Sequence, residues 1–540
     1  MKSDGQKLFS PVQVGPMTLA HRVVMAPLTR SRSKQPGDIP SDLMLEYYTQ
    51  RASQGGFIIS EATSISFTAR GWFGAPGLYS DQQVDGWKRI TDAVHARGAH
   101  MFSQLWHLGR SSHVSMTDGR APVAPSVNPQ YWLDAKPSIS TPSGWAPPSP
   151  HRALDIAEIP GIVEDYRRAA ERAKAAGFEG VELHAANGYL VDQFLQDGSN
   201  QRTDAYGGSV ENRSRFLLEI VAALASVWGG NRVAVRIGPG GTWNGMSDSN
   251  PRALFDYVAE QLNRFSLAYL HVIEPRVKGN VLIAEGQAPV ATERLRKIFK
   301  GRIISAGGFE PDTAEAIVEK GDADLVAFGR YFVANPDLPK RIKLGLPLNA
   351  YDRATFYTFD SHGYTDYPFY DQTRDRLLSD PFCPQLRGSP FYYDSCHNAG
   401  LARAPASAGP GPESKNKAIV LEAFDTLFNR RDYVAAERFW SPSYIQHSAH
   451  IAPGREGLFN LVKNSPPTLK YEPGAIVADG DFVIVHGRFS GIDRPHNWIA
   501  ADILRVQDGV LVEHWDVIQD EASREQSKSG LPMFGETFPK

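Results

Sequence analysis

The segment from Val181 to Gly208, VELHAANGYLVDQFLQDGSNQRTDAYGG, gathers side chains that can act on a carbonyl compound. His184 and Asn187 can both donate hydrogen bonds to one carbonyl oxygen, and such donors stabilise the enolate-like charge that develops there. Tyr189 carries a phenol that can supply a proton. A lone His or Tyr is more often a satisfied core residue than a catalyst. Three such groups close together indicate a reactive site.

Glycines and an arginine further along the chain indicate a phosphate site. Gly307, Gly308, Gly329 and Arg330 follow two short apolar runs, where backbone N–H groups and a cation can bind a phosphate. The alternative is that these glycines only turn the chain. Arg236 also ends an apolar run, where a permanent cation can stabilise a negatively charged group, with a structural salt bridge as the alternative.

Strands and helices must bring these residues together. Short apolar runs alternate with amphipathic stretches, which is the pattern of repeated strand–helix units. Helices are predicted at Asp85–Arg97 and Ile162–Ala176. Eight strands are predicted, at Arg22–Pro27, Phe57–Thr63, Ala99–His107, Gly180–Ala186, Arg232–Pro239, Ala268–Pro275, Arg302–Gly308 and Leu325–Arg330. Eight units favour an α/β fold, a closed (β/α)8 TIM barrel over residues 1–370, with its chemistry at the carboxyl ends of the strands.

The motifs, taken in order, resemble those of the Old Yellow Enzyme family of FMN-dependent ene-reductases. HAANGY at 184–189 is accompanied by LFSP at 8–11, MAPLTR at 25–30, QLWHLGR at 104–110, VRIGP at 235–239, SAGG at 305–308, FGR at 328–330 and GYTDYP at 363–368. The resemblance implies FMN as cofactor and NADPH or NADH as electron donor. It also implies a small-molecule enone or enal as substrate.

The same resemblance assigns roles to single residues. His184 and Asn187 bind the substrate's carbonyl oxygen while hydride passes from reduced FMN to the β-carbon, and Tyr189 protonates the α-carbon from the opposite face. Gln104 binds the flavin ring as acceptor and donor together. Trp106 and His107 line the substrate cavity, with barrel core as the alternative for Trp106. The residues expected to bind FMN are Pro27, Thr29, Gln104, Arg236, Gly307, Gly308, Gly329 and Arg330.

The barrel pattern stops near Tyr370. Residues 371–416 are interpreted as an irregular tail followed by a flexible linker, Ala402–Asn416, which is rich in Ala, Gly, Pro and Ser. Helical periodicity returns at Lys417–Arg430. Strand-like runs follow at Ala475–Ala478, Phe482–Phe489, Asn497–Val506 and Val510–Ile518, with a hairpin turn at Asp508–Gly509. Residues 417–540 are therefore predicted to be a separate α+β domain.

This second domain resembles the SnoaL-like branch of the nuclear transport factor 2 fold, in which a curved sheet and helices enclose a conical pocket. YIQH at 444–447, GREG at 454–457 and EHWD at 513–516 carry the resemblance. Its candidate residues are His447, His514 and Asp516, as acid/base groups. Strand alternation puts His514 and Asp516 on one face. Binding or dimerisation without catalysis is the alternative, and no metal is expected because the histidines lack tight ligand spacing.

The composition argues against nucleic-acid binding, a membrane segment and an iron–sulfur cluster. The chain has 57 Lys+Arg against 60 Asp+Glu, so no basic field is available for nucleic acid. No long apolar run indicates a membrane segment, and two cysteines cannot hold an iron–sulfur cluster. We expect a cytoplasmic protein, with a homo-oligomer formed through the C-terminal domain left open. Two alternatives to reduction are a flavin-binding scaffold whose second domain binds a ligand or partner, and a barrel that isomerises its substrate.

Overall fold

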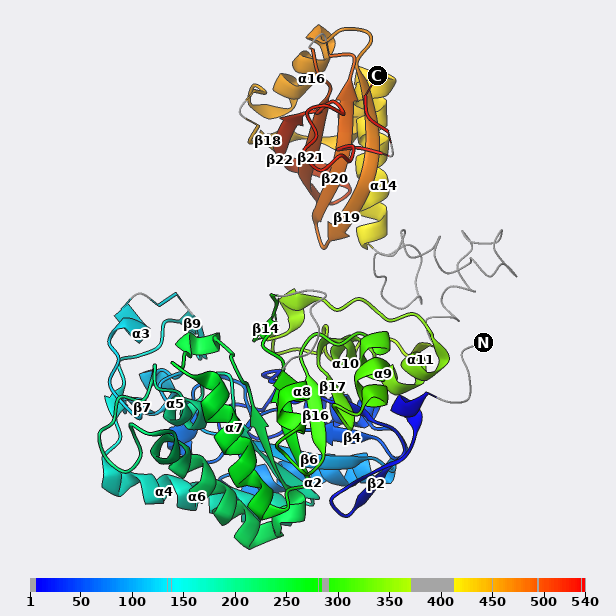
Figure 1. The fold of residues 1–540 in the computed structure, drawn as a ribbon. Helices are drawn as coiled ribbons and strands as arrows, with labels where there is room; N and C mark the ends of the chain where they lie inside the picture. Colours follow the sequence, from blue (N-terminus) through cyan, green and yellow to red (C-terminus); the bar gives the residue numbers. More distant parts are fainter. Residues whose placement is uncertain are drawn as a thin grey trace. The chain divides into compact units, whose positions relative to one another are not determined.

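The computed structural model divides the chain into two compact units, residues 1–383 and 384–540. It describes residues 6–133, 135–136, 138–279, 281–283, 291–370, 412–448, 450–492, 495–535 and 537–539. Each unit has its own buried core, and Figure 1 shows the elements of both.

The first unit is a closed barrel of eight parallel strands. They are β3 (Val23–Met25), β4 (Phe57–Ile59), β6 (His100–Trp106), β11 (Gly180–Ala185), β12 (Val233–Ile237), β13 (Tyr269–Ile273), β16 (Ile303–Ala306) and β17 (Leu325–Phe328). Each strand pairs with its neighbour, and the β6–β11 and β17–β3 pairings close the ring. The predicted strands and the TIM barrel are confirmed.

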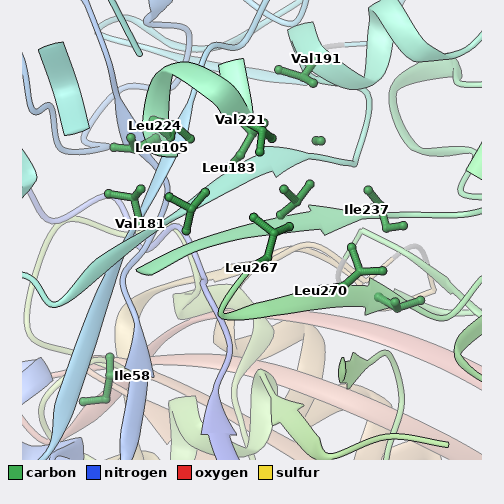
Figure 2. Packing of buried hydrophobic residues seen from close by; sticks show 14 of the residues in the cluster. Ile58, Leu105, Val181, Leu183, Val191, Val221, Leu224, Ile237, Leu267 and Leu270 are labelled. Atoms are coloured by element: carbon green, nitrogen blue, oxygen red, sulfur yellow. The ribbon is translucent and has the colours of Figure 1, made fainter. Parts of the chain in front are cut away.

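Helices cover the outside of the ring and bury the outward side chains of the strands. They include α1 (Asp42–Arg51), α2 (Asp81–Ala96), α4 (Ile159–Ala175), α5 (Leu190–Leu195), α6 (Val210–Trp228), α7 (Pro251–Leu262), α8 (Ala291–Arg296), α9 (Pro311–Lys320), α10 (Arg330–Ala334) and α11 (Leu338–Leu344). Figure 2 shows strand residues such as Leu183 and Ile237 in one buried cluster with Val221 and Leu224 of α6. Full burial of one such side chain stabilises the fold by about 1.5–3 kcal/mol.

The two helices predicted in the barrel begin earlier than expected. Helix α2 starts at Asp81 because Ser80 and Gln83 form a capping box, in which each side chain bonds the other's backbone N–H. Helix α4 starts at Ile159, and Gly177 follows its end at φ +84°. A capping box therefore fixes the start of α2, whereas α4 starts without a side-chain cap and has Pro160 in its first turn.

The interior of the barrel is apolar at its amino end. A hairpin of β1 (Val12–Val14) and β2 (Met17–Leu19) belongs to the same buried cluster as Phe57, Phe102 and Tyr269. Its turn at Gly15 lies against Asn231 and Ala268, just before β12 and β13. The hairpin therefore fills the amino end, and a ligand site must lie at the carboxyl end of the strands.

The second unit has a five-stranded sheet in the order β18-β22-β21-β20-β19. Its strands are β18 (Trp440–Gln446), β19 (Lys470–Asp479), β20 (Phe482–Ser490), β21 (Trp498–Gln507) and β22 (Val510–Asp520), with helices α14 (Pro412–Phe424), α15 (Tyr433–Ala436) and α16 (Gly454–Asn464). The predicted turn is present, since Asp508 and Gly509 have φ values of +50° and +82°. Strand β18, parallel to β22, was not predicted.

The linker prediction needs a correction at its end. Residues 412–416 belong to α14, and the Asn416 side chain is buried, with Nδ2 donating to the carbonyl oxygen of Gly480 at 3.1 Å. A proline is compatible with the first turn of a helix, so a composition rich in Pro and Ser did not separate linker from helix. The rest of the expected tail and linker, 371–411, lies outside the described residues.

Candidate active site

A cavity of about 450 Å³ opens at the carboxyl ends of the barrel strands. Twelve of the residues singled out from the barrel sequence line it. They are Pro27, Thr29, Gln104, Trp106, His184, Asn187, Tyr189, Arg236, Gly307, Gly308, Gly329 and Arg330. Because these residues come from loops and strands far apart in sequence, the barrel topology is what brings them together.

His184, Tyr189 and Trp106 form one aromatic group on the cavity wall. The rings of His184 and Tyr189 lie 4.9 Å apart edge to face, and Trp106 lies 4.8 Å from Tyr189 and stacks 6.2 Å from His184. His184 Nδ1 and Trp106 Nε1 are buried without a partner among the described residues. Buried polar atoms are normally hydrogen-bonded, so such atoms beside a cavity point to a ligand that completes them.

The loop after β11 sets the positions of Asn187 and Tyr189. Asn187 and Gly188 both have positive φ, +58° and +72°, so the chain turns sharply before Tyr189, the N-cap residue of α5. A Cβ at position 188 would lie 2.8 Å from the carbonyl oxygen of Trp243, which leaves room for glycine alone. Asp192 holds the turn by accepting a hydrogen bond from the Gly188 N–H at 2.8 Å. The backbone is therefore rigid where these side chains enter the cavity.

Electrostatics keep both titratable groups of this wall neutral. Burial, and then the charge of Arg236, hold the pKa of His184 well below its usual range, so the ring is an uncharged donor at pH 7. Burial raises the pKa of Tyr189 far above that of a free phenol. The phenol therefore retains its proton and can release it to a stronger base formed during a reaction.

Glycines at the ends of β16 and β17 form a close-fitting cradle. Gly307 and Gly308 have φ values of +111° and +69°, and a Cβ on Gly308 would approach Leu282 to 2.5 Å. Gly329 caps the start of α10, followed by Arg330. Backbone N–H groups that no side chain shields, next to a guanidinium, fit a phosphate group.

Arg236 supplies the cation at the other side of the cavity. Its Nε is buried without a partner among the described residues, and its Nη1 reaches the Pro27 carbonyl oxygen only at 3.5 Å. Spare N–H groups on a permanent cation fit the anionic ring of a reduced flavin. Together with the glycine cradle, this donor set fits FMN.

One sequence expectation gains detail and another changes. Gln104 borders the cavity, and its Nε2 donates to Glu182 Oε1 at 2.7 Å, so the amide oxygen and the second N–H of Nε2 remain for a ligand. His107 does not line the cavity. Since Trp106 points inward, the next residue points outward, and His107 Nδ1 accepts from the Gly109 N–H at 3.0 Å. Burial lowers the pKa of His107 to about 3.

Sequence reasoning missed the aromatic residues of the cavity. Trp72, Trp145 and Tyr357 line it and contact one another, with ring centroids 5.2–6.1 Å apart. Trp72 comes from the segment after β5 (Thr63–Ser64), Trp145 from β9 (Gly144–Ala146) and Tyr357 from the chain beyond α11. No single stretch of sequence carries this pattern.

The second unit places a polar cluster on one face of its sheet. Asp502, His514 and Asp516 come from β21 and β22. One ring nitrogen of His514 and one carboxylate oxygen of each aspartate lie within 4.8 Å of one another. His514 is bonded on both sides, by Asp502 Oδ1 at 3.0 Å and by Gln446 Oε1 at 3.0 Å. Ser448 Oγ donates to Asp516 Oδ2 at 2.7 Å. His514 and Asp516 share a face as predicted.

The bonds around His514 require an additional proton. Gln446 Oε1 already accepts from the Ser448 N–H at 3.1 Å, so His514 Nδ1 must donate to it. Nε2 then either carries a second proton or accepts one from Asp502. Burial raises the pKa of Asp502 against the opposing effect of His514, so the pair holds a proton between two side chains.

His447 does not join this cluster. Its Nε2 lies 2.9 Å from Glu513 Oε1 and its ring stacks on Trp515 at 4.7 Å. Residues 513 and 515 lie on the opposite face of β22 from residues 514 and 516, because side chains alternate along a strand. Of the three candidate residues of this unit, His514 and Asp516 lie together and His447 lies apart from them.

The comparisons agree with this division. The sequence profile of the NADH:flavin oxidoreductase / NADH oxidase family matches residues 7–349, and that of the SnoaL-like domain matches residues 420–514. The chain belongs to the NADH:flavin oxidoreductase / NADH oxidase family, the Old Yellow Enzyme family, with a SnoaL-like domain at its C-terminus. It is accordingly an NAD(P)H-dependent, FMN-binding oxidoreductase.

Individual relatives match the barrel along nearly all of their length. 12-Oxophytodienoate reductase 2 of Arabidopsis thaliana is 46% identical over 371 residues, which is 68% of this chain and 96% of that protein. The solved structure of morphinone reductase with tetrahydroNAD is 49% identical, with a TM-score of 0.63, covering 68% of this chain and 99% of that one. The Old Yellow Enzyme homologue of Zymomonas mobilis is 42% identical at the same TM-score, covering 67% and 99%.

No helix among the described residues has the length and apolar character needed to cross a bilayer.

Proposed function

We propose that the barrel reduces the C=C bond of α,β-unsaturated carbonyl compounds. The observation that carries this proposal is the contact of His184 with Tyr189 beside a cavity into which Arg236 and Gln104 also face. A neutral hydrogen-bond donor and a protonated phenol on one wall suit the addition of hydride and a proton to a polarised double bond. FMN, when bound and reduced by NADPH or NADH, supplies the hydride.

The residues of this wall divide the work. His184 and Asn187 hold the carbonyl oxygen, and one such donor contributes about 10²–10³ in rate. Tyr189 transfers its proton to the α-carbon after the β-carbon has received hydride. Thr29 and Pro27 lie with Gln104 along the cavity, where they would contact the flavin ring, and Gly307, Gly308, Gly329 and Arg330 would hold its phosphate. The names of the relatives, reductases of oxophytodienoate and morphinone, fit this class of substrate.

Anaerobic half-reactions test the proposal. The purified protein should be reduced by NADPH or NADH and then reoxidised by cyclohexenone, with cyclohexanone as product. If the flavin is reduced but the enone leaves it reduced, the scaffold alternative is correct. If a β,γ-unsaturated ketone is converted to its conjugated isomer without consumption of NAD(P)H, the isomerase alternative is correct.

A second function is supported by the cluster in the SnoaL-like unit. We propose that His514, Asp502 and Asp516 form an acid/base site for carbonyl compounds, because the bonds around His514 hold a proton that can be exchanged. The full chain with oxidised flavin and no NAD(P)H should exchange the α-hydrogens of cyclohexanone in D₂O. Asp516→Asn should abolish that exchange, whereas Tyr189→Phe should leave it unchanged. Equal exchange in wild type and Asp516→Asn would favour a role in binding or assembly.

A further inference from the structure

A layer of polar side chains lies between the apolar interior of the barrel and the cavity. Gln104 on β6, Glu182 on β11 and His271 on β13 are each at most 1% exposed. Glu182 Oε1 accepts from Gln104 Nε2 at 2.7 Å, and Glu182 Oε2 lies 2.9 Å from His271 Nδ1. The Glu182 carboxylate on β11 therefore links β6, which pairs with β11 on one side, to β13, which is the second strand on the other side.

The first consequence concerns the orientation of Gln104. A carboxylate only accepts hydrogen bonds, so Glu182 selects the rotamer that turns the amide NH₂ inward. The amide oxygen of Gln104 accepts no hydrogen bond from any described residue, and Gln104 borders the cavity. The orientation that Glu182 selects therefore leaves the amide oxygen of Gln104 as the acceptor available to the ligand, beside the second N–H of Nε2. On the pyrimidine edge of oxidised flavin the one N–H group is N3–H, which is the donor that an acceptor can bind.

The second consequence concerns charge. Burial alone raises the pKa of Glu182, but the charge of Arg236 and the hydrogen bonds from His271 and Gln104 outweigh burial, so the pKa lies below its usual value and the group is ionised. Burial lowers the pKa of His271 despite Glu182, so His271 is neutral. Tyr269 and His184, which also face this layer, are uncharged. The remaining charges are the Glu182 carboxylate and the Arg236 guanidinium, which oppose each other.

We propose that Glu182 is a positioning residue for the flavin: it fixes Gln104 as an acceptor and offsets the Arg236 charge, which lowers the reduction potential of the bound FMN. The inference rests on FMN binding and is independent of the substrate. Glu182 and Arg236 lie on the adjacent strands β11 and β12, where Glu182 pairs with Ala234, two residues before Arg236, so both side chains face the same side of the sheet. Arg236 would stabilise the reduced, anionic ring, and a carboxylate this close reduces that stabilisation. The carboxylate also keeps a permanent cation from being uncompensated in the protein before FMN binds.

The test is the midpoint potential of bound FMN in Glu182→Gln, measured against a reference dye in the full chain. We expect the potential to rise, with reduction favoured at least tenfold, or about 30 mV for a two-electron couple. Glu179→Gln is the matched control. Glu179 directly precedes β11, the strand that carries Glu182, and it is likewise a hydrogen-bonded carboxylate, with His95 and His100 as partners. Unlike Glu182, it lies at the amino end of the barrel. An unchanged potential in Glu182→Gln, or an equal rise in Glu179→Gln, would overturn the proposal.

A second variant separates charge from orientation. Glu182→Asp keeps the charge and shortens the reach to Gln104, so the potential should stay near wild type while FMN binds at least tenfold more weakly in fluorescence titrations. Wild-type FMN affinity in Glu182→Asp would contradict the role in orienting Gln104. If neither variant holds FMN while Glu179→Gln does, Glu182 is required for folding of the site and the proposal is wrong. Failure to reduce enones would instead affect the proposed function alone.

Discussion

The site histidines of the two units differ in their hydrogen bonding. In the barrel, His184 Nδ1, Trp106 Nε1 and Arg236 Nε are buried with no partner among the described residues, and all three residues line the cavity. In the SnoaL-like unit, both nitrogens of His514 are bonded to neighbouring side chains. Unsatisfied buried donors cost free energy, which a bound ligand recovers. The barrel site therefore has donors that a ligand must complete, whereas the His514 ring is satisfied by its neighbours and shares a proton with Asp502, even though Asp502 Oδ2 and Gln446 Nε2 are buried without a partner among the described residues.

The largest expected effect comes from removing the proton donor of the barrel. Tyr189→Phe should slow reoxidation of the reduced flavin by cyclohexenone about 10²- to 10⁴-fold, the range for general acid catalysis, and leave flavin reduction by NAD(P)H unchanged. Stopped-flow absorbance follows both steps. Tyr206→Phe is the control, since its hydroxyl bonds Glu219 outside the cavity. Equal slowing of both half-reactions would mean that Tyr189 shapes the flavin site instead.

Removing a carbonyl donor should have the next largest effect. His184→Ala should lower kcat/KM for cyclohexenone about 10²- to 10³-fold and weaken binding of a phenol, measured by the change in flavin absorbance. Because the pKa of His184 lies well below its usual range, phenol binding to the wild type should show no histidine titration between about pH 6 and 8. His107→Ala should keep phenol affinity, and a loss there equal to that in His184→Ala would place His107 in the site.

The proton shared by Asp502 and His514 should have a smaller effect, on the stability of the second unit. The pKa of Asp502 is higher in the folded protein than in the unfolded chain, so its contribution to stability is complete below about pH 4 and is lost as pH rises through the folded value. Asp502→Asn should remove this dependence. Amide hydrogen exchange of β21 and β22, corrected for intrinsic rates, should show protection falling with pH in the wild type and less in the variant. The same slope in both would contradict the shared proton.

The smallest expected effect is on the barrel when the second unit is removed. We propose that residues 1–370, 371–416 and 417–540 are barrel, connecting segment and SnoaL-like domain, and that a chain ending at residue 401 binds FMN and reduces cyclohexenone as the full chain does. All residues of the barrel cavity precede residue 358. FMN content and kcat/KM are the measurements. Loss of FMN would show that the second unit supports the first.

Much of the barrel could be predicted from the sequence. The eight strands are short apolar runs bounded by turns, and twelve of its thirteen site residues line the cavity because strand ends in a barrel converge. His107 lies outside the cavity because one step along a strand, from Trp106 to His107, moves the side chain to the opposite face of the sheet. Period-two spacing could have found Glu182, two residues before His184, but its bonds to Gln104 and His271 join separate strands and no local pattern shows them.

The second unit was harder to predict because its site depends on pairing between strands. Asp502 meets His514 through the β21–β22 hairpin register, and no local pattern distinguishes Asp502 from the other acidic residues. The position of His447 relative to the cluster could not be predicted because β18 was not predicted. The parallel register that puts Gln446 opposite His514 decides which of residues 446 and 447 faces the cluster.

The hairpin in the amino end of the barrel has a kinetic consequence. With β1 and β2 packed in that interior, the cavity is reached from the carboxyl end alone among the described parts of the barrel. Nicotinamide and enone must then enter by the same mouth and occupy the same face of the site in turn. Steady-state rates should give parallel lines in double-reciprocal plots, and each substrate should inhibit competitively against the other at high concentration.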